Sequence, residues 1–432
     1  MPLQDRRRAT PRTDRVLADP ALREAAARLG DRLVKESVTR AQERCRAGDL
    51  APEEVVGAAL ADLPATAGSL RRVLNATGVV VHTNLGRAPL SAAAVAAVEV
   101  AAGATDVELD LATGRRGRRG RSALAALADA VPEAGGVHVV NNGAAALALV
   151  TVALAVGRTV VVARGEMVEI GDGFRIPELL ESVGARLREV GTTNRVRLAD
   201  YAAAVDEETA FVLKVHPSNF RVEGFTASVP VRELATLPVP VVADTGSGLL
   251  APHPRLPGEP SAARALQEGA AVVTASGDKL LGGPQCGLVL GQAELVRRLA
   301  RHPFARAVRV DKLTLAALEA TLRGPTPPVA RALVADQDEL LDRAHRLVAE
   351  LAGTIDAEAL RSTAAVGGGG APGVALPSAA VALPAALAEP LRTGSPPVMG
   401  HVTGGRLLLD LIAVPPQEDS VLLTAVRRAV GV

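Results

Sequence analysis

Three separated stretches of this sequence carry residue types that could act together in catalysis. In "VVNNGAAALAL" a strand pattern runs through Asn142 and Gly143 into a helical pattern, and in "PVVADTGSG" Asp244 stands at a strand end. In "SGDKLLGGPQCG", Lys279 follows the apolar run "AAVVTA". A lysine at such a position must pair, lose its charge or form a covalent bond. Desolvation lowers the pKa of its amine and makes it a nucleophile toward a carbonyl.

Each stretch alone has an ordinary alternative. The backbone N–H groups from Asn142 to Ala144 suit an anion, but many strand–helix junctions bind nothing. Asp244 could be a turn carboxylate, and Lys279 could pair with Asp278. Their order is more specific. A phosphate-binding helix start, an aspartate after a strand and a lysine about 35 positions later are typical of aminotransferase-like pyridoxal-phosphate (PLP) enzymes. There the aspartate keeps the pyridine nitrogen protonated.

The elements that must position these residues alternate along the chain. From about Leu74, short β-branched runs alternate with Ala/Leu-rich helical stretches, which predicts an α/β fold with a mostly parallel central sheet. We expect a helical domain at residues 1–65, with Asp19 and Pro20 as a helix start, and an α/β core at 66–320. After residues 303–323 a long helix should lead into a small α+β domain at 321–432, which ends with the strand "GRLLLDL".

Composition excludes several classes of protein. The chain has 432 residues, is 48% hydrophobic and has a net charge of +1, so no global field draws it to DNA or RNA. Two cysteines and seven scattered histidines provide no disulfide framework and no metal site. The start of the chain lacks the apolar segment of a signal peptide, and residues 144–156 are too short an apolar run to span a bilayer. We therefore expect a cytoplasmic protein without membrane contact.

Longer motifs identify a family resemblance. They cover nearly the whole chain from residue 11 onward, and they resemble bacterial selenocysteine synthases, the L-seryl-tRNA(Sec) selenium transferases. The most specific are "LNATGVVVHTNLGRAPLS", "RGEMVEIGDGFRIPE", "EVGTTNR", "KVHPSNFRVEGFT", "SGDKLLGGPQCG" and "GSPPVMGHVTGGRLLLDL". The resemblance implies conversion of L-seryl-tRNA(Sec) to L-selenocysteinyl-tRNA(Sec) through an aminoacrylyl-tRNA intermediate, with PLP as cofactor and selenophosphate as selenium donor.

The resemblance also assigns roles around the lysine. It makes Lys279 the residue that holds PLP as a Schiff base, and its released amine the candidate carrier of the α-proton. Asp278 would hold that amine in place, and Asp244 would face the pyridine nitrogen. His216 or His82 would stack on the PLP ring, although a satisfied core histidine is an equal alternative.

Four arginines match the active site of the same family. They are Arg87 in "NLGR", Arg119 in "RRGRRGR", and Arg306 and Arg309 in "FARAVRV". Guanidinium groups bind planar oxyanions with two parallel hydrogen bonds, which suits selenophosphate or the phosphates of a tRNA acceptor end. Taken alone, "RRGRRGR" could equally be a solvated basic loop.

The helical N-terminal segment resembles the tRNA-binding domain of the family. Its first 46 residues hold 12 Lys/Arg and seven Asp/Glu, an excess that suits contact with tRNA phosphates. A solvated helix face is the simpler alternative for those charges. The family further implies a homodecamer built from dimers, with active sites at subunit interfaces.

Two rival functions and two local features stay open. A related PLP-dependent ammonia-lyase acting on a phosphorylated amino sugar or amino acid would keep Lys279 and Asp244 without needing the basic N-terminal domain. A tRNA-binding homologue that has lost catalysis is the other rival. Cys286 stands where a small residue is expected. It could simply be a small buried residue, or it could act as a redox or selenium relay. The four-glycine run at 367–370 follows neither nucleotide-binding pattern and suggests a mobile turn.

Overall fold

The computed structural model describes residues 9–431. The charged start of the chain at residues 1–8, which contributes to the predicted basic excess, lies outside the described residues. The chain divides into two compact units, Met1–Arg72 and Val73–Val432. The predicted boundaries at 65 and 320 stay a prediction. Among the described helices, none combines the length and the apolar character that crossing a bilayer requires.

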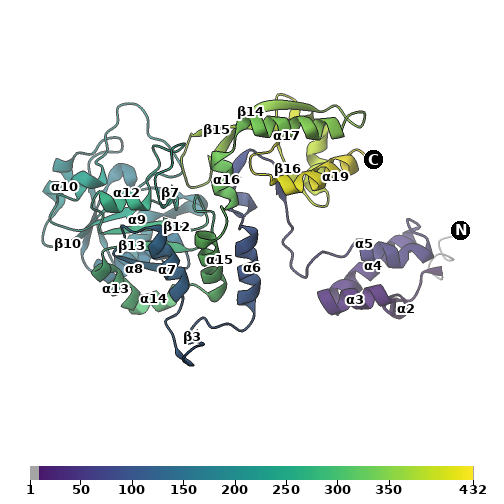
Figure 1. Ribbon diagram of the computed structural model, residues 1–432, viewed down its shortest axis with the longest axis horizontal. Coiled ribbons are helices and arrows are strands. Elements are labelled where there is room, and N and C mark those ends of the chain that lie inside the picture. Colours follow the sequence, from purple (N-terminus) through teal and green to yellow (C-terminus); the bar gives the residue numbers. More distant parts are fainter. Residues whose placement is uncertain (1–8, 432) are drawn as a thin grey trace. The chain divides into compact units, whose positions relative to one another are not determined.

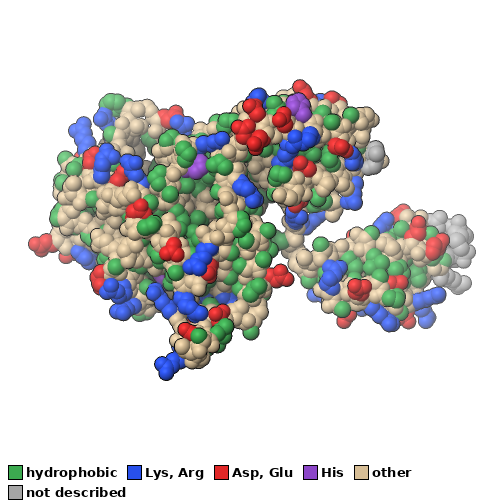
Figure 2. Space-filling view, in the orientation of Figure 1, with side chains coloured by type: hydrophobic (Ala, Val, Ile, Leu, Met, Phe, Trp, Pro, Cys, Tyr) green, Lys and Arg blue, Asp and Glu red, His purple; other side chains and the backbone are tan. Residues whose placement is uncertain are grey.

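The first unit is a small helical bundle. Its helices are α2 (Thr13–Leu17), α3 (Pro20–Leu29), α4 (Asp31–Ala47), η1 (Pro52–Glu54) and α5 (Val55–Ala61). As predicted, α3 begins at Pro20, because the Asp19 side chain accepts a hydrogen bond from the Ala21 N–H at 2.9 Å. Apolar residues at helical spacing form its core, which includes Val16, Leu22, Val34, Val38 and Val55. Figure 2 shows Lys/Arg and Asp/Glu side chains interspersed on the visible face of this unit.

The second unit is built on a seven-stranded sheet with the order β5-β13-β12-β11-β10-β6-β9. All neighbours are parallel except β13, which runs antiparallel to both β12 and β5. The mostly parallel α/β core is therefore confirmed. The strands are β5 (Gly136–Val140), β6 (Thr159–Ala163), β9 (Arg186–Val190), β10 (Thr209–Val215), β11 (Val241–Asp244), β12 (Val272–Ser276) and β13 (Gly287–Gly291).

Helices cover both faces of this sheet (Figure 1). Alternate strand residues point to opposite faces, so Val160 and Val162 pack into one layer while Val161 and Ala163 pack into the other. The first layer includes α8 (Gly143–Leu154), α9 (Ile176–Ser182), α13 (Ala293–Arg301) and α14 (Pro303–Ala307). The second includes α7 (Arg121–Ala130), α10 (Leu198–Ala204), α11 (Val231–Leu234), α12 (Ala262–Gln267) and α15 (Lys312–Arg323). Helix α6 (Ala92–Ala102) lies against α15.

The C-terminal part has its own five-stranded sheet, in the order β17-β18-β15-β14-β2. Its strands are β14 (Glu358–Gly367), β15 (Ala375–Pro384), β17 (His401–Thr403), β18 (Arg406–Asp410) and β2 (Val79–Val81). The last of these comes from before the central sheet and pairs in parallel with β14. The expected final strand is confirmed as β18. The helices are α16 (Pro328–Val334), α17 (Gln337–Glu350), α18 (Ala388–Thr393) and α19 (Asp419–Ala429).

The long helix expected to lead into this part is the 14-residue α17, and the shorter α16 stands between it and α15. Pro328 begins α16, and the Asp336 side chain caps the N-terminus of α17 by accepting from the Asp338 and Glu339 N–H groups. A proline start and an aspartate cap so close together divide the segment into two helices.

Candidate active site

The predicted residues meet at one edge of the central sheet. Strands β10, β11 and β12 are neighbours and parallel, so their carboxyl ends lie side by side. His216 follows β10, Asp244 ends β11, and Lys279 lies in the turn that follows β12. The backbone N–H of His216 donates to the Asp244 carbonyl oxygen at 3.0 Å, which ties two of the three together.

The Lys279 side chain is half-buried, and its amine is unpaired. No hydrogen bond or ion pair joins it to another described residue, and burial is the main cause that lowers the pKa of Lys279. The charge of Arg87 lowers it further, while Asp244, Asp278 and Glu259 act in the opposite direction. A lowered pKa favours the neutral, nucleophilic form of a lysine amine.

Asp278 pairs with Arg87 and not with its neighbour Lys279. The Arg87 Nη1 lies 2.7 Å from the Asp278 Oδ2, and the Ala88 N–H donates to the Asp278 carbonyl oxygen. Arg87 has a φ of 66°, an unusual conformation for a residue with a side chain. It is held there by a backbone hydrogen bond from its N–H to the His82 carbonyl oxygen at 2.9 Å. Asp278 Oδ1 is buried without a hydrogen-bond partner among the described residues.

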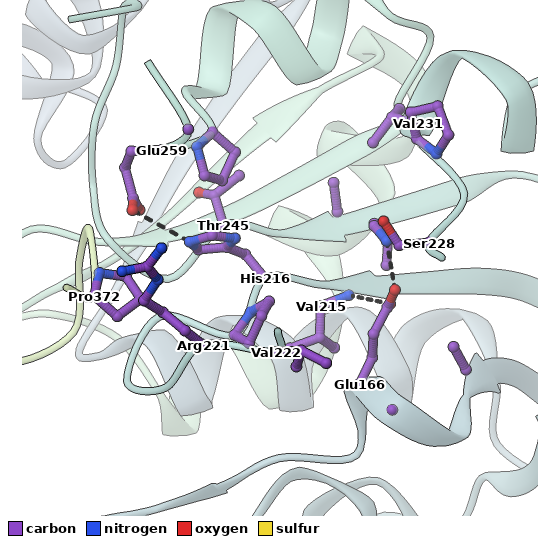
Figure 3. A pocket seen from close by; sticks show the side chains of 18 of the residues that line it. Glu166, Val215, His216, Arg221, Val222, Ser228, Val231, Thr245, Glu259 and Pro372 are labelled. Atoms are coloured by element: carbon purple, nitrogen blue, oxygen red, sulfur yellow. Dashed lines mark hydrogen bonds and ion pairs between the residues drawn. The ribbon is translucent and has the colours of Figure 1, made fainter. Parts of the chain in front are cut away.

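Asp244 lines a cavity of about 780 Å³, which Figure 3 shows from close by. The Thr274 hydroxyl donates to its Oδ1 at 2.7 Å. Burial is the main cause that raises the pKa of Asp244, against the opposing effects of Thr274, Lys279 and His216. The protein alone thus leaves this carboxylate short of positive charge, and a protonated heterocyclic nitrogen would supply it.

The start of helix α8 approaches the lysine turn closely. The Asn142 side chain caps this 12-residue helix by accepting from the Ala145 N–H at 2.8 Å. A Cβ at Gly143 would lie 2.7 Å from the hydroxyl oxygen of Ser276, so a larger residue there would have to displace the Ser276 side chain. The first backbone N–H groups of α8, at Gly143 and Ala144, therefore lie beside the end of β12, where an anionic group can bind them.

Two of the predicted arginines share one carboxylate. Glu108 Oε1 lies 3.4 Å from Arg119 Nη1 and 3.8 Å from Arg309 Nη1. Arg309 forms a β-bridge with Val140 at the end of β5, close to the start of α8. Arg306 is exposed in the last turn of α14, and no ion pair with a described residue engages it.

His216 has a carboxylate partner that the sequence did not indicate. Its Nε2 lies 3.2 Å from Glu259 Oε2, and Figure 3 shows the two side chains facing each other. His82 forms a β-bridge with Arg87, and its Nδ1 is buried without a partner among the described residues. The structure thus brings His216, and not His82, against the cavity that Asp244 lines.

Several other residues around the site were missed by sequence reasoning. Glu166 and Lys214 form a partly buried ion pair in the wall of the same cavity. Glu259 stands in the Pro/Gly-rich stretch "HPRLPGEPS" and Glu108 in a short hairpin, where no periodic pattern marks them. The only usable signal for Glu166 was its place in the family-like motif "RGEMVEIGDGFRIPE".

Comparison with known proteins decides the family. The family described as L-seryl-tRNA selenium transferase matches residues 73–415, and the one described as selenocysteine synthase N terminal matches residues 7–46. The chain belongs to this selenium transferase family. A relative from Geobacter sulfurreducens, named L-seryl-tRNA(Sec) selenium transferase, is 40% identical over 96% of this chain and 98% of its own length. One of the same name from Hyphomonas neptunium is 45% identical over 79% of each chain.

Among solved structures, a D-glucosaminate-6-phosphate ammonia-lyase is similar in fold. It aligns with a TM-score of 0.58 at 17% identity, over 84% of this chain and 96% of that chain. This likeness concerns the fold alone. The aminotransferase-like PLP fold predicted for this family member is confirmed.

Proposed function

We propose that this chain converts L-seryl-tRNA(Sec) into L-selenocysteinyl-tRNA(Sec), with PLP as cofactor and selenophosphate as selenium donor. Family membership supports the reaction and the cofactor. The observation that carries the proposal within the structure is the half-buried, unpaired amine of Lys279. It lies in the turn after β12, within reach of the charge of Asp244, and the start of α8 packs against the end of the same strand.

The residues present fit PLP. The pyridine nitrogen would face Asp244, whose burial leaves it short of positive charge, and the phosphate would bind at Asn142, Gly143 and Ala144. The aldehyde carbon would bond to the amine of Lys279. Bound PLP supplies an electron sink for the negative charge that develops when the Cα–H bond of the seryl group breaks.

The protein groups then divide the remaining work. When it is not bonded to the cofactor, the Lys279 Nζ would take up the proton that leaves the seryl Cα. Its lowered pKa favours the neutral form that this step needs. Asp278 positions Arg87 beside this amine through their 2.7 Å ion pair. The ring of His216 lies at the cavity wall, in a position to pack against the cofactor.

Oxyanion binding falls to the four arginines. Arg87 lies beside Lys279, and Arg119 and Arg309 converge on Glu108 near the start of α8. A phosphoryl group would replace the Glu108 carboxylate as their partner, with Arg306 free to contribute. We assign these arginines to selenophosphate and to the phosphates of the tRNA acceptor end.

The partners follow from the same proposal. The N-terminal helical unit would bind the body of tRNA(Sec), which the match of residues 7–46 to the family's N-terminal segment supports. We further propose a homodecamer built from dimers, which acts in the cytoplasm because charged tRNA is used there.

The test is conversion of seryl-tRNA(Sec) and of ordinary seryl-tRNA with selenophosphate supplied. We expect selenocysteinyl product from the first only. Lys279→Ala should lower turnover by about a thousandfold or more, while Lys312→Ala, outside the site, should leave it unchanged. Absence of product from either tRNA, or turnover by Lys279→Ala close to that of the unmodified protein, would reject the proposal. Ammonia release from a phosphorylated amino sugar would then favour the lyase.

A further inference from the structure

The glycine-rich loop at residues 367–373, hereafter the glycine loop, lies directly on Lys279. It connects β14 to β15 in the C-terminal sheet, far from Lys279 in sequence. A Cβ at Gly369 would lie 2.6 Å from Cε and 2.8 Å from Nζ of Lys279. Gly369 also has a φ of 87°, which L side chains rarely adopt. The loop backbone therefore covers the lysine side chain. The predicted turn is confirmed, and its mobility stays a prediction.

A buried carboxylate from another part of the chain holds this loop. The Glu259 side chain is only 1% exposed, and its Oε2 accepts a hydrogen bond from the Ala371 N–H at 2.5 Å. The same oxygen lies 3.2 Å from Nε2 of His216. Ala371 has a φ of 45°, so the loop adopts a backbone conformation that needs such support. In Figure 3, Pro372 of the loop lies beside Glu259 and His216.

We propose that Glu259 is a positioning residue that holds the glycine loop over Lys279 and fixes the ring of His216. One oxygen serves both contacts, so loop and ring are held together or released together. Because Glu259 accepts, neutral His216 carries its proton on Nε2, and Nδ1 is left as an acceptor. This inference rests on the role proposed for Lys279: the loop would keep water away from the Lys279 amine while the substrate is bound.

The test measures access to the Lys279 amine. The chain has only four lysines, so reductive methylation followed by mass spectrometry resolves each of them. The full-length protein is used after removal of the cofactor, which leaves the amine of Lys279 free. Lys35 is exposed and serves as the labelling reference. Lys214 is half-buried in its pair with Glu166 and reports general loosening of the fold.

Glu259→Ala and Glu259→Gln form the matched pair of variants. In Glu259→Ala, labelling of Lys279 should become about tenfold faster, the size of effect expected when a hydrogen bond to a charged group is lost, with Lys35 and Lys214 unchanged. Glu259→Gln keeps a carbonyl oxygen for Ala371 and should restore most of the protection. Equal labelling of Lys279 in Glu259→Ala and in the unmodified protein overturns the proposal, and so does a failure of Glu259→Gln to restore protection.

A second measurement needs no variant and decides the matter if Glu259→Ala also exposes Lys214. Hydrogen exchange in the unmodified full-length protein should find the Ala371 amide protected and the amide of Gly373 faster. Exchange of Ala371 at the rate of a free amide overturns the proposal. Neither readout depends on turnover. If Glu259 turns out not to hold the glycine loop, the proposed reaction is therefore unaffected. Conversely, loss of the proposed reaction leaves the measured protection of Lys279 intact.

Discussion

Cofactor binding and the stability of the cofactor-free fold favour different protonation states of Asp244. Burial raises the pKa of Asp244, so the ionised form that would hold a protonated ring nitrogen costs stability when that nitrogen is absent. A raised folded-state pKa means that the protonated carboxyl stabilises the fold at low pH. That contribution is lost as the pH rises through the folded value. Function and stability therefore conflict at this residue in the cofactor-free protein.

Asp244→Asn should separate the two demands. The asparagine Oδ1 can still accept from the Thr274 hydroxyl, which lies 2.7 Å from Asp244 Oδ1, but it carries no charge. Without cofactor, thermal unfolding at neutral pH should show the variant more stable by about 1 kcal/mol, with the difference shrinking toward acid pH. Turnover should fall about a hundredfold or more. A cofactor-free variant less stable than the unmodified protein at neutral pH would contradict the assignment.

Cys286 is the residue for which the sequence left a catalytic role open. It is fully buried beside Gly277, and burial raises the pKa of the Cys286 thiol to about 12. A relay would need an accessible thiolate, whereas this thiol stays protonated near neutral pH. The structure therefore favours a structural role for Cys286, as a small buried residue, over a relay role.

Alkylation checks this conclusion about Cys286. Iodoacetamide should modify neither Cys286 nor the equally buried Cys45 in the native protein at pH 8, and both after unfolding. Cys286→Ala should keep its turnover at a stability cost of about 1 kcal/mol. Rapid native alkylation of Cys286, or loss of turnover in a folded Cys286→Ala, would restore the relay.

At the scale of elements, the sequence predicts best where a strand is mostly apolar and β-branched. The runs that become β6, β10, β11 and β12 are β-branched and buried on both faces, so composition marks them. By contrast β9, "RLREV", is mostly polar, and β13, "GLVLG", is glycine-flanked and antiparallel. Neither carries the signal of a buried parallel strand.

The same limit applies to the site. Asp244 and Lys279 were predictable because each follows an apolar run, so their positions at a strand end are local properties. Glu259 acts through His216 and Ala371, residues 43 positions before it and 112 positions after it. Such partners are set by how distant loops meet, which no local pattern encodes.

Helix α4 carries an electrostatic prediction. Arg44 and Arg46 are exposed in its last turn without an ion-pair partner among the described residues, whereas Arg32 on the same helix pairs with Glu36 at 2.9 Å. If α4 contacts tRNA phosphates, Arg44→Ala with Arg46→Ala should weaken tRNA binding and reduce the salt dependence by about one unit of slope per lost contact. Arg32→Ala is the matched control, with a smaller effect. Equal salt slopes in the double variant and the unmodified protein would exclude contact through this turn.

At the scale of the whole molecule, the lysine site and the helical bundle belong to different compact units of the chain. All site residues from Arg87 to Ala371 lie in the unit Val73–Val432, and the bundle has its own apolar core. Residues 64–72 are largely exposed and join the two units. A unit with its own core can fold alone, and an exposed linker is where a chain can be cut.

A protein consisting of residues 73–432 should therefore fold and bind PLP, because every residue assigned to the cofactor is retained. It should also lose its preference for seryl-tRNA(Sec) over ordinary seryl-tRNA, since the bundle would provide that discrimination. Cofactor absorbance measures the first property, and competition between the two tRNAs measures the second. A truncated protein that binds PLP yet still prefers seryl-tRNA(Sec) would move recognition into the catalytic unit. One that cannot bind PLP would mean that the bundle supports the site, although it contributes none of the residues assigned here.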